Sequence, residues 1–185
     1  MDDIVKAAML KWPQVPHCHD WLALDARGQW FMRDDRTQAA GSFPQIKGCR
    51  ILHDKLLEFI QRNYSHDEHG AWYFQNGPQR VYVALEAAPF VWRVGLAHER
   101  WQVHAHTGQP AHLLSAWLDE SGRLFLDTDL GFGLVHTMDT GAAAVAIEAG
   151  VWQPQEMAFA EMPARFGYIL HPRPIGAADA AAASR

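Results

Sequence analysis

The clearest pattern of hydrophobic and polar positions lies in the middle of the chain, from Ala71 to Gly95. Apolar runs at Trp72–Gln75 and Arg80–Leu85 flank the tetrapeptide Asn-Gly-Pro-Gln. Because glycine tolerates a positive φ and proline fixes the backbone beside it, this tetrapeptide is typical of a tight turn. The pattern predicts a β-hairpin, and Phe90–Leu96 is predicted to continue as a further strand.

A recurring turn sequence, Asp-x-x-Gly, predicts two more hairpins. One copy begins at Asp25 inside the apolar segment Trp21–Met32, and another begins at Asp119 between Leu113–Leu118 and Arg123–Asp127. Aspartate bonds the backbone of its own turn and glycine accepts a positive φ, so short apolar runs on both sides favour paired strands. We interpret the recurrence as shared turn chemistry and not as internal duplication.

Apolar residues at intervals of three and four positions predict helices elsewhere in the chain. The predicted helices are Asp2–Trp12, Ile51–Tyr64 and a short one from Asp139 or Thr140 to Glu148. The other predicted strands are Trp101–His106, Gly133–Thr137 and Phe166–Leu170, and the predicted polar loops are Arg33–Gly48 and Ser65–Gly70. This order indicates an α+β fold in which a few helices pack on antiparallel β-sheets.

A boundary near Gly95 would divide the chain into two small lobes that share an interface. Residues 1–95 are predicted to form an N-terminal α+β lobe, and residues 96–175 a β-rich C-terminal lobe. The length of 185 residues suits one domain or two small lobes of this kind. Residues 176–185 are rich in alanine and lack an apolar face, so they are predicted to form a disordered tail.

Charge and composition narrow the class of protein. The net charge is −5 and the arginines are scattered among carboxylates, whereas nucleic-acid binding needs a concentrated basic surface, so no nucleic-acid partner is expected. The acidic start does not look like a signal peptide, and no apolar run approaches the roughly 20 residues that span a membrane. We expect a cytoplasmic protein with reduced thiols at Cys18 and Cys49 and no membrane partner. Few lysines beside many alanines and arginines are typical of bacterial proteins from GC-rich genomes.

Histidine is the first candidate for chemistry, with 11 residues in the chain. His104 and His106 are two positions apart on a predicted strand, so both imidazoles would point to one face, which is a spacing that metal sites use. His112 or His136 could supply a third ligand. Because no HExxH motif is present, a metal-dependent hydrolytic enzyme with this histidine cluster is retained only as the alternative function, and no metal or other cofactor is expected.

Cys18 and Glu86 are two further candidates for a reactive role. Cys18 lies between His17 and His19, but neighbours on an extended chain point in opposite directions, so the histidines are poorly placed as bases. Glu86 ends an apolar strand, where Arg80 or Arg93 could pair with it as a structural ion pair. Whether the chain is an enzyme is left open by these patterns.

The order of these motifs resembles proteobacterial families of unknown function. The resemblance rests on D-x-x-G-x-W at Asp25–Trp30, a helix, the central hairpin and the segment Glu86–Phe90. The matching positions are Asp25, Gly28, Trp30, Pro78, Glu86, Pro89 and Phe90. The resemblance implies a small α+β lobe and a β-rich lobe with a ligand cleft between them, and it implies no activity.

We therefore expect a ligand-sensing or interaction module whose cleft lies between the lobes. The residues expected to bind a small-molecule ligand are Gln75, Arg80, Glu86, His104 and His106. Eight tryptophans could add flat faces to such a site, although most are expected in the core. An exposed sheet edge could also join two copies of the chain in a homodimer.

Overall fold

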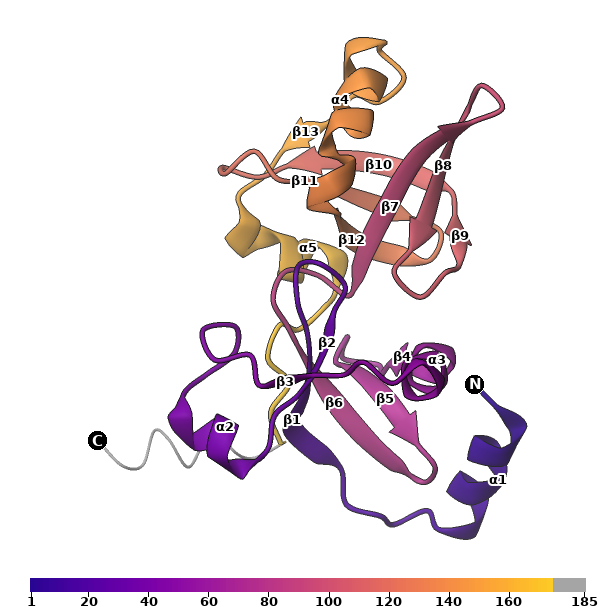
Figure 1. Ribbon diagram of the computed structural model, residues 1–185, viewed down its shortest axis with the longest axis vertical. Helices are drawn as coiled ribbons and strands as arrows, with labels where there is room; N and C mark the ends of the chain where they lie inside the picture. The colour runs from indigo at the N-terminus through magenta and orange to yellow at the C-terminus, as the bar shows by residue number, and fades with distance from the viewer. Residues whose placement is uncertain (175–185) are drawn as a thin grey trace. The chain divides into compact units, whose positions relative to one another are not determined.

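The structure, a computed structural model, describes residues 1–174 and divides by compactness into two units (Figure 1). Of the described residues, the first unit contains Met1–Ala23, Phe31–Ala84 and 171–174, and the second contains Leu24–Trp30 and Leu85–Leu170. The predicted α+β class is confirmed, because helices accompany a sheet of six strands and a sheet of seven strands. The predicted boundary at residue 95 falls inside a strand, and the predicted division into lobes 1–95 and 96–175 stays a prediction.

The first sheet has the strand order β3-β2-β1-β6-β5-β4. In that order its strands are β3 Cys49–Arg50, β2 Trp30–Met32, β1 Cys18–Leu24, β6 Gln79–Leu85, β5 Trp72–Asn76 and β4 Tyr64–His66. The helices of this part of the chain are α1 Asp3–Lys11, α2 Asp35–Ala40 and α3 Asp54–Arg62. The prediction of strands at the central hairpin and around Asp25 is confirmed, whereas the short strands β3 and β4 were not predicted.

The central hairpin closes with the predicted turn. Asn76 pairs with Gln79, and Gly77 between them has a φ of 57°. Gln75 is fully buried, and its side-chain amide donates a hydrogen bond to the carbonyl oxygen of Gly77 at 2.9 Å. A buried amide that bonds the turn it adjoins fixes the hairpin geometry, because a buried polar group needs a partner.

The helices of the first unit differ in two ways from the prediction. Helix α3 begins at Asp54, three residues later than predicted, because His53 lies at the N-cap and its Nδ1 accepts the N–H of Leu56. The prediction of a loop over Arg33–Gly48 is wrong, since α2 forms there with Asp34 as its cap. None of the residues of α2 is buried, so its sequence carries no apolar stripe.

The second sheet has the strand order β13-β10-β11-β12-β7-β8-β9. In that order its strands are β13 Gln155–Glu156, β10 Leu113–Leu118, β11 Leu124–Thr128, β12 Gly131–Val135, β7 Phe90–Ala97, β8 Arg100–Ala105 and β9 Pro110–Ala111. The helices of this unit are α4 Thr140–Glu148, α5 Met162–Phe166 and the short 3₁₀ helices η1 Thr137–Asp139 and η2 Phe159–Glu161. Most pairings are antiparallel as predicted, but β12 pairs with β7, and β13 with β10, in parallel.

The strand predicted at Phe166–Leu170 is wrong. Phe166 is the last residue of α5, and Gly167 ends the helix in the left-handed region with a φ of 66°. The ring of Phe166 stacks on Phe132 at a centroid distance of 3.8 Å, so the aromatic residue serves helix packing. The predicted disordered tail, residues 176–185, lies outside the described residues.

The recurring Asp-x-x-Gly turns at Asp25 and Asp119 are confirmed. In each, the Oδ1 atom of the aspartate accepts the backbone N–H groups two and four residues later at 2.8 to 2.9 Å. Asp67 forms a third turn with the same pattern at 3.0 Å, which was not predicted. The shared side-chain chemistry explains the recurrence. Across residues 1–174, no helix is long and apolar enough to cross a membrane.

Candidate functional site

The candidate site lies on one face of the hairpin β7–β8 in the second unit. Arg93 stands directly opposite His104, and Gly95 stands directly opposite Gln102. Because residues two apart in a strand share a face, all four lie on the same side of the sheet. The intervening Val94 is 7% exposed and belongs to the core on the other side. The hairpin therefore presents a polar face and is anchored by its apolar one.

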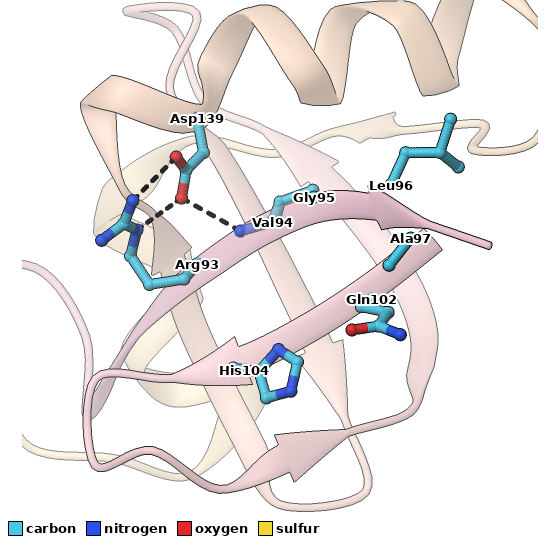
Figure 2. A pocket seen from close by; sticks show the side chains of 8 residues that line it. All are labelled: Arg93, Val94, Gly95, Leu96, Ala97, Gln102, His104 and Asp139. Atoms are coloured by element: carbon cyan, nitrogen blue, oxygen red, sulfur yellow. Dashed lines mark hydrogen bonds and ion pairs between the residues drawn. The ribbon is translucent and has the colours of Figure 1, made fainter. Parts of the chain in front are cut away.

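Gly95 leaves the centre of this face open. Its φ lies outside the left-handed region, and a Cβ atom added there would meet no described atom within 4 Å. Neither backbone conformation nor packing therefore requires glycine. A depression of about 230 Å³, which we call the Gly95 depression, is present here (Figure 2). Its lining residues are Arg93, Val94, Gly95, Leu96, Ala97, Gln102, His104 and Asp139.

Asp139 fixes the arginine at one end of the depression. Its Oδ2 atom accepts a hydrogen bond from Nε of Arg93 at 2.6 Å, and its Oδ1 atom accepts one from Nη2 at 3.1 Å (Figure 2). The Arg93 bond lowers the pKa of Asp139 although partial burial opposes it, and the N–H of Val94 lowers it further. β12 pairs with β7 only as far as Trp92. Beyond that point, the Oδ2 atom of Asp139 accepts a hydrogen bond from the N–H of Val94 at 3.0 Å. The carboxylate thus orients Arg93 and completes the strand edge.

A second depression of about 430 Å³ shares Arg93 and His104 with the first. Its lining residues are Arg27, Gly28, Val91, Arg93, His104, Ala105, His106, Gly108 and His136. We call it the Gly28 depression. Two arginines and three histidines are among these residues, and none of them is a carboxylate. Hydrogen-bonding side chains are therefore concentrated here, and Arg27 adds a positive charge while the charge of Arg93 is balanced by Asp139.

His106 forms the rigid base of the Gly28 depression. The Nδ1 atom of its ring accepts a hydrogen bond from the backbone N–H of Val91 at 3.2 Å, and the backbone N–H of His106 donates one to the carbonyl oxygen of Val91 at 2.8 Å. Burial lowers the pKa of His106 to about 3, so the imidazole is neutral at ordinary pH. A Cβ atom added at Gly28 would lie 2.8 Å from Cβ of His106. The histidine and the Asp25 turn therefore hold one another in place.

The Asp25 turn positions Arg27 at the rim of the same depression. Asp25 is 3% exposed and binds the turn backbone, while Oε2 of Glu86 accepts the N–H of Ala26 at 3.1 Å. Arg93 pairs with Asp139, and the guanidinium of Arg80 lies over a tyrosine ring. The ion pair of Glu86 with Arg80 or Arg93 stays a prediction. Glu86 holds the turn through the N–H of Ala26.

The structure therefore brings together only part of the predicted ligand set. His104 and His106 line one depression, and Glu86 supports the turn that carries Arg27. Gln75 and Arg80 belong to the first unit, where Gln75 closes the central hairpin and Arg80 lies 4.6 Å from the ring centroid of Tyr73. The binding role of these five residues and the cleft between two lobes stay predictions.

The alternative chemistry of the sequence finds no geometric support in the described chain. Residues 1–174 contain no group of three or more His, Cys, Asp or Glu side chains that could hold a metal ion. His106 follows the end of β8, and its Nδ1 is occupied by Val91. Partial burial raises the pKa of Cys18, and Asp20 raises it further, which disfavours the reactive thiolate.

Sequence reasoning missed Arg27, Arg93, Gly95 and Asp139 as site residues. Two of them carry a local signal, because Arg93 and Gly95 interrupt the otherwise apolar strand β7. A glycine inside a strand often marks a place where a ligand or another chain approaches closely. The contact of Arg93 with Asp139 joins positions 46 residues apart and has no such signal.

Comparison with known proteins assigns nearly the whole chain to a protein family. Residues 1–173 match the family described as protein of unknown function (DUF2946), which confirms the predicted resemblance to families of unknown function. No curated protein matches the chain. A DUF1285 family protein from Shewanella baltica OS155 is 14% identical, with a TM-score of 0.45 over 67% of this chain and 90% of that one. A DUF1285 family protein from Silicibacter pomeroyi DSS-3 is 14% identical, with a TM-score of 0.49 over 77% and 83%.

Proposed function

The chain belongs to the DUF2946 family of proteins of unknown function, and on that premise we propose that it is a binding module for a small anion. The observation that carries the proposal is the pair of depressions on β7–β8. In these depressions the open space at Gly95 adjoins arginine and histidine side chains that can donate hydrogen bonds. Asp139, the carboxylate of the Gly95 depression, is already bound to Arg93.

The side chains of this site suit an anion in charge and in geometry. Charge-assisted hydrogen bonds from arginine to carboxylate or phosphate oxygens are shorter and stronger than neutral ones. Arg93 is held by Asp139, so less conformational entropy is lost when it binds a ligand. Gln102 and His104 add polar groups on the adjacent strand. The volume of about 430 Å³ lies in the lower part of the usual small-molecule range, roughly 300–1,000 Å³, and the volume of about 230 Å³ lies below it, so the site suits a small ligand.

The lining residues support binding and sensing more than covalent chemistry. They include no serine and no cysteine, and their one carboxylate is ion-paired. Signals from such a site would reach a partner through the hairpin β7–β8 or through α4, which contacts β7. Self-association as a homodimer stays a prediction, and light scattering that reports a monomer at every practical concentration would contradict it.

The proposal is tested by thermal unfolding of the full chain with sodium salts of phosphate, sulfate, acetate, succinate and citrate at matched ionic strength. We expect one of these anions to raise the melting temperature of the wild type above its value in chloride. His104→Ala should lose most of that increase. His112→Ala is the matched control, because the side chain of His112 is 87% exposed and pairs with Asp129 instead. Equal stabilisation of wild type and His104→Ala, or none in either, would contradict the proposal.

A further inference from the structure

A buried arginine in the first unit has no acidic partner within ion-pair distance among residues 1–174. Arg33 follows β2 and is 3% exposed. Its Nε donates to the carbonyl oxygen of Ile46 at 3.3 Å, and its Nη2 donates to the carbonyl oxygen of Gly41 at 2.6 Å. Two carbonyl oxygens accept hydrogen bonds from part of the guanidinium, and neither of them carries a net charge.

Burial of an unpaired charge is costly, so this arrangement needs an explanation. A guanidinium has five N–H groups in a planar fork, and transfer of an ion from water into a protein interior costs several kcal/mol. Carbonyl oxygens stabilise the N–H groups but carry no net charge. The Nε and Nη2 atoms bond the loop, and no residue of the described part of the chain accepts from Nη1, so that end of the fork is left for another acceptor.

A cavity of about 360 Å³ lies against this arginine. Its lining residues, all from the first unit, are Asp20, Arg33, Ser42, Phe43, Pro44, Gln45, Ala84, His171 and Arg173. Arg173 adds a second cation at the rim, and Asp20 is the only carboxylate among the lining residues. Ser42 donates to Oε1 of Gln45 at 3.3 Å, which leaves the amide NH₂ of Gln45 as a further donor.

Two arginines and one aspartate act on His171, which also lines the cavity. Partial burial lowers the pKa of His171, and the charge of Arg173 lowers it further, as does that of Arg33. Asp20 acts in the opposite direction. The balance of these charges favours an anion in the cavity over a cation.

The loop from residue 41 to residue 48 is built around Arg33. A Cβ atom at Gly48 would lie 2.5 Å from the carbonyl oxygen of Met32 and 3.2 Å from Cγ of Arg33. Phe43 is 3% exposed and packs in a core cluster with Ala23, Phe31 and Ala84. The loop is therefore anchored by packing, and Arg33 is held with a fixed orientation before any ligand arrives. A preorganised donor of this kind loses little entropy on binding.

We propose that this cavity, the Arg33 cavity, is an anion site of its own that takes a carboxylate or phosphate group of a small molecule. The ligand oxygens accept from the Nη1 end of Arg33, with Arg173 and the amide of Gln45 as further donors. The site is separate from the depressions on β7–β8, because every one of its lining residues belongs to the first unit. A negative result for the anion site proposed in the second unit would leave this proposal unaffected, and the reverse also holds.

The test is isothermal titration of the full chain with inorganic phosphate and, separately, with acetate, at constant ionic strength. The variants are Arg173→Ala, an exposed position, and Arg33→Lys, which keeps the charge and removes the planar fork. Arg36→Ala in α2 is the matched control, since Arg36 is an exposed arginine outside the cavity lining. We expect Arg173→Ala to weaken binding about tenfold, Arg33→Lys to weaken it more, and Arg36→Ala to bind as the wild type does.

Each outcome decides the proposal. Saturable binding by phosphate, by acetate or by both supports it when Arg33→Lys weakens binding most, Arg173→Ala weakens it less and Arg36→Ala leaves it unchanged, and the anion that binds more tightly identifies the preferred ligand group. Absence of saturable binding by both anions overturns it, and so does equal weakening by Arg173→Ala and Arg36→Ala, which would indicate general charge attraction. Gly95→Val serves as a cross-check. It should leave binding at the Arg33 cavity unchanged, whereas it blocks the site proposed on β7–β8.

Discussion

Replacement of Gly95 by valine separates the stability of β7 from the binding role of its exposed face. Gly95 is not at a positive φ, and a Cβ atom there meets no described atom within 4 Å. Valine can therefore adopt the backbone of β7 without strain. Its methyl groups would occupy the Gly95 depression of about 230 Å³ between Arg93 and Gln102.

The expected effect on stability is favourable and small. Glycine inside a strand costs roughly 0.5–1 kcal/mol relative to alanine, and strand propensities span about 1 kcal/mol. A gain of about 0.5–1 kcal/mol raises the melting temperature of a chain of this size by roughly 1–4 °C. Because the methyl groups exclude the ligand, anion affinity should fall at least about tenfold, which corresponds to about 1.4 kcal/mol.

The assay combines thermal unfolding by circular dichroism with titration of the anion that stabilises the wild type. Gly141→Ala is the control, because Gly141 in α4 also has an ordinary φ and open space at its Cβ position. It should stabilise the protein and bind the anion normally. A drop of several degrees for Gly95→Val, or unchanged affinity, would refute the argument that this glycine is kept to leave a binding surface open.

Three further predictions follow from other contacts. Because burial lowers the pKa of folded His106 from 6.5 to about 3, unfolded chains bind an extra proton between these values, so stability should fall as the pH falls from 6.5 to 3. His106→Gln should flatten that dependence of the melting temperature, and an identical slope would contradict the assignment. Asp25→Ala leaves two turn N–H groups without their acceptor and should lower the free energy of unfolding, measured in urea, by about 1–3 kcal/mol. An unchanged free energy would contradict the stabilising role of these two hydrogen bonds. Asp139→Ala should speed hydrogen exchange at the Val94 amide, and unchanged protection would exclude the proposed strand-edge role.

Local chemistry made much of the fold predictable. The turn at Gly77 and the Asp-x-x-Gly turns at Asp25 and Asp119 depend on residues within five positions of one another, so the sequence contains their whole explanation. Helix α2 was missed because it buries no residue and therefore has no apolar period. The run Phe166–Leu170 was misread because a short apolar segment fits a helix end as well as a strand.

The candidate site was less predictable because its contacts are distant in sequence. The spacing of His104 and His106 predicts that both imidazoles share a strand face, yet the strand ends at Ala105, and the alternation of side chains ends with it. The polar pattern of Arg33–Gly48 predicts a loop, where an arginine is ordinarily solvated. Its burial depends on how residues 41–48 fold around it, which the local pattern does not encode.

The most direct test of the anion site on β7–β8 is a titration of the ¹⁵N-labelled full chain with each anion of the panel, followed by amide chemical shifts. We predict saturable shifts at Gly95, Gln102 and His104 with a common dissociation constant, and none of these shifts in Gly95→Val. Shifts at Ser42 and Gln45 would report the Arg33 cavity separately. Amides of β7 and β8 that do not move for any anion, or that move linearly without saturation, would contradict the proposal that this face binds a small anion.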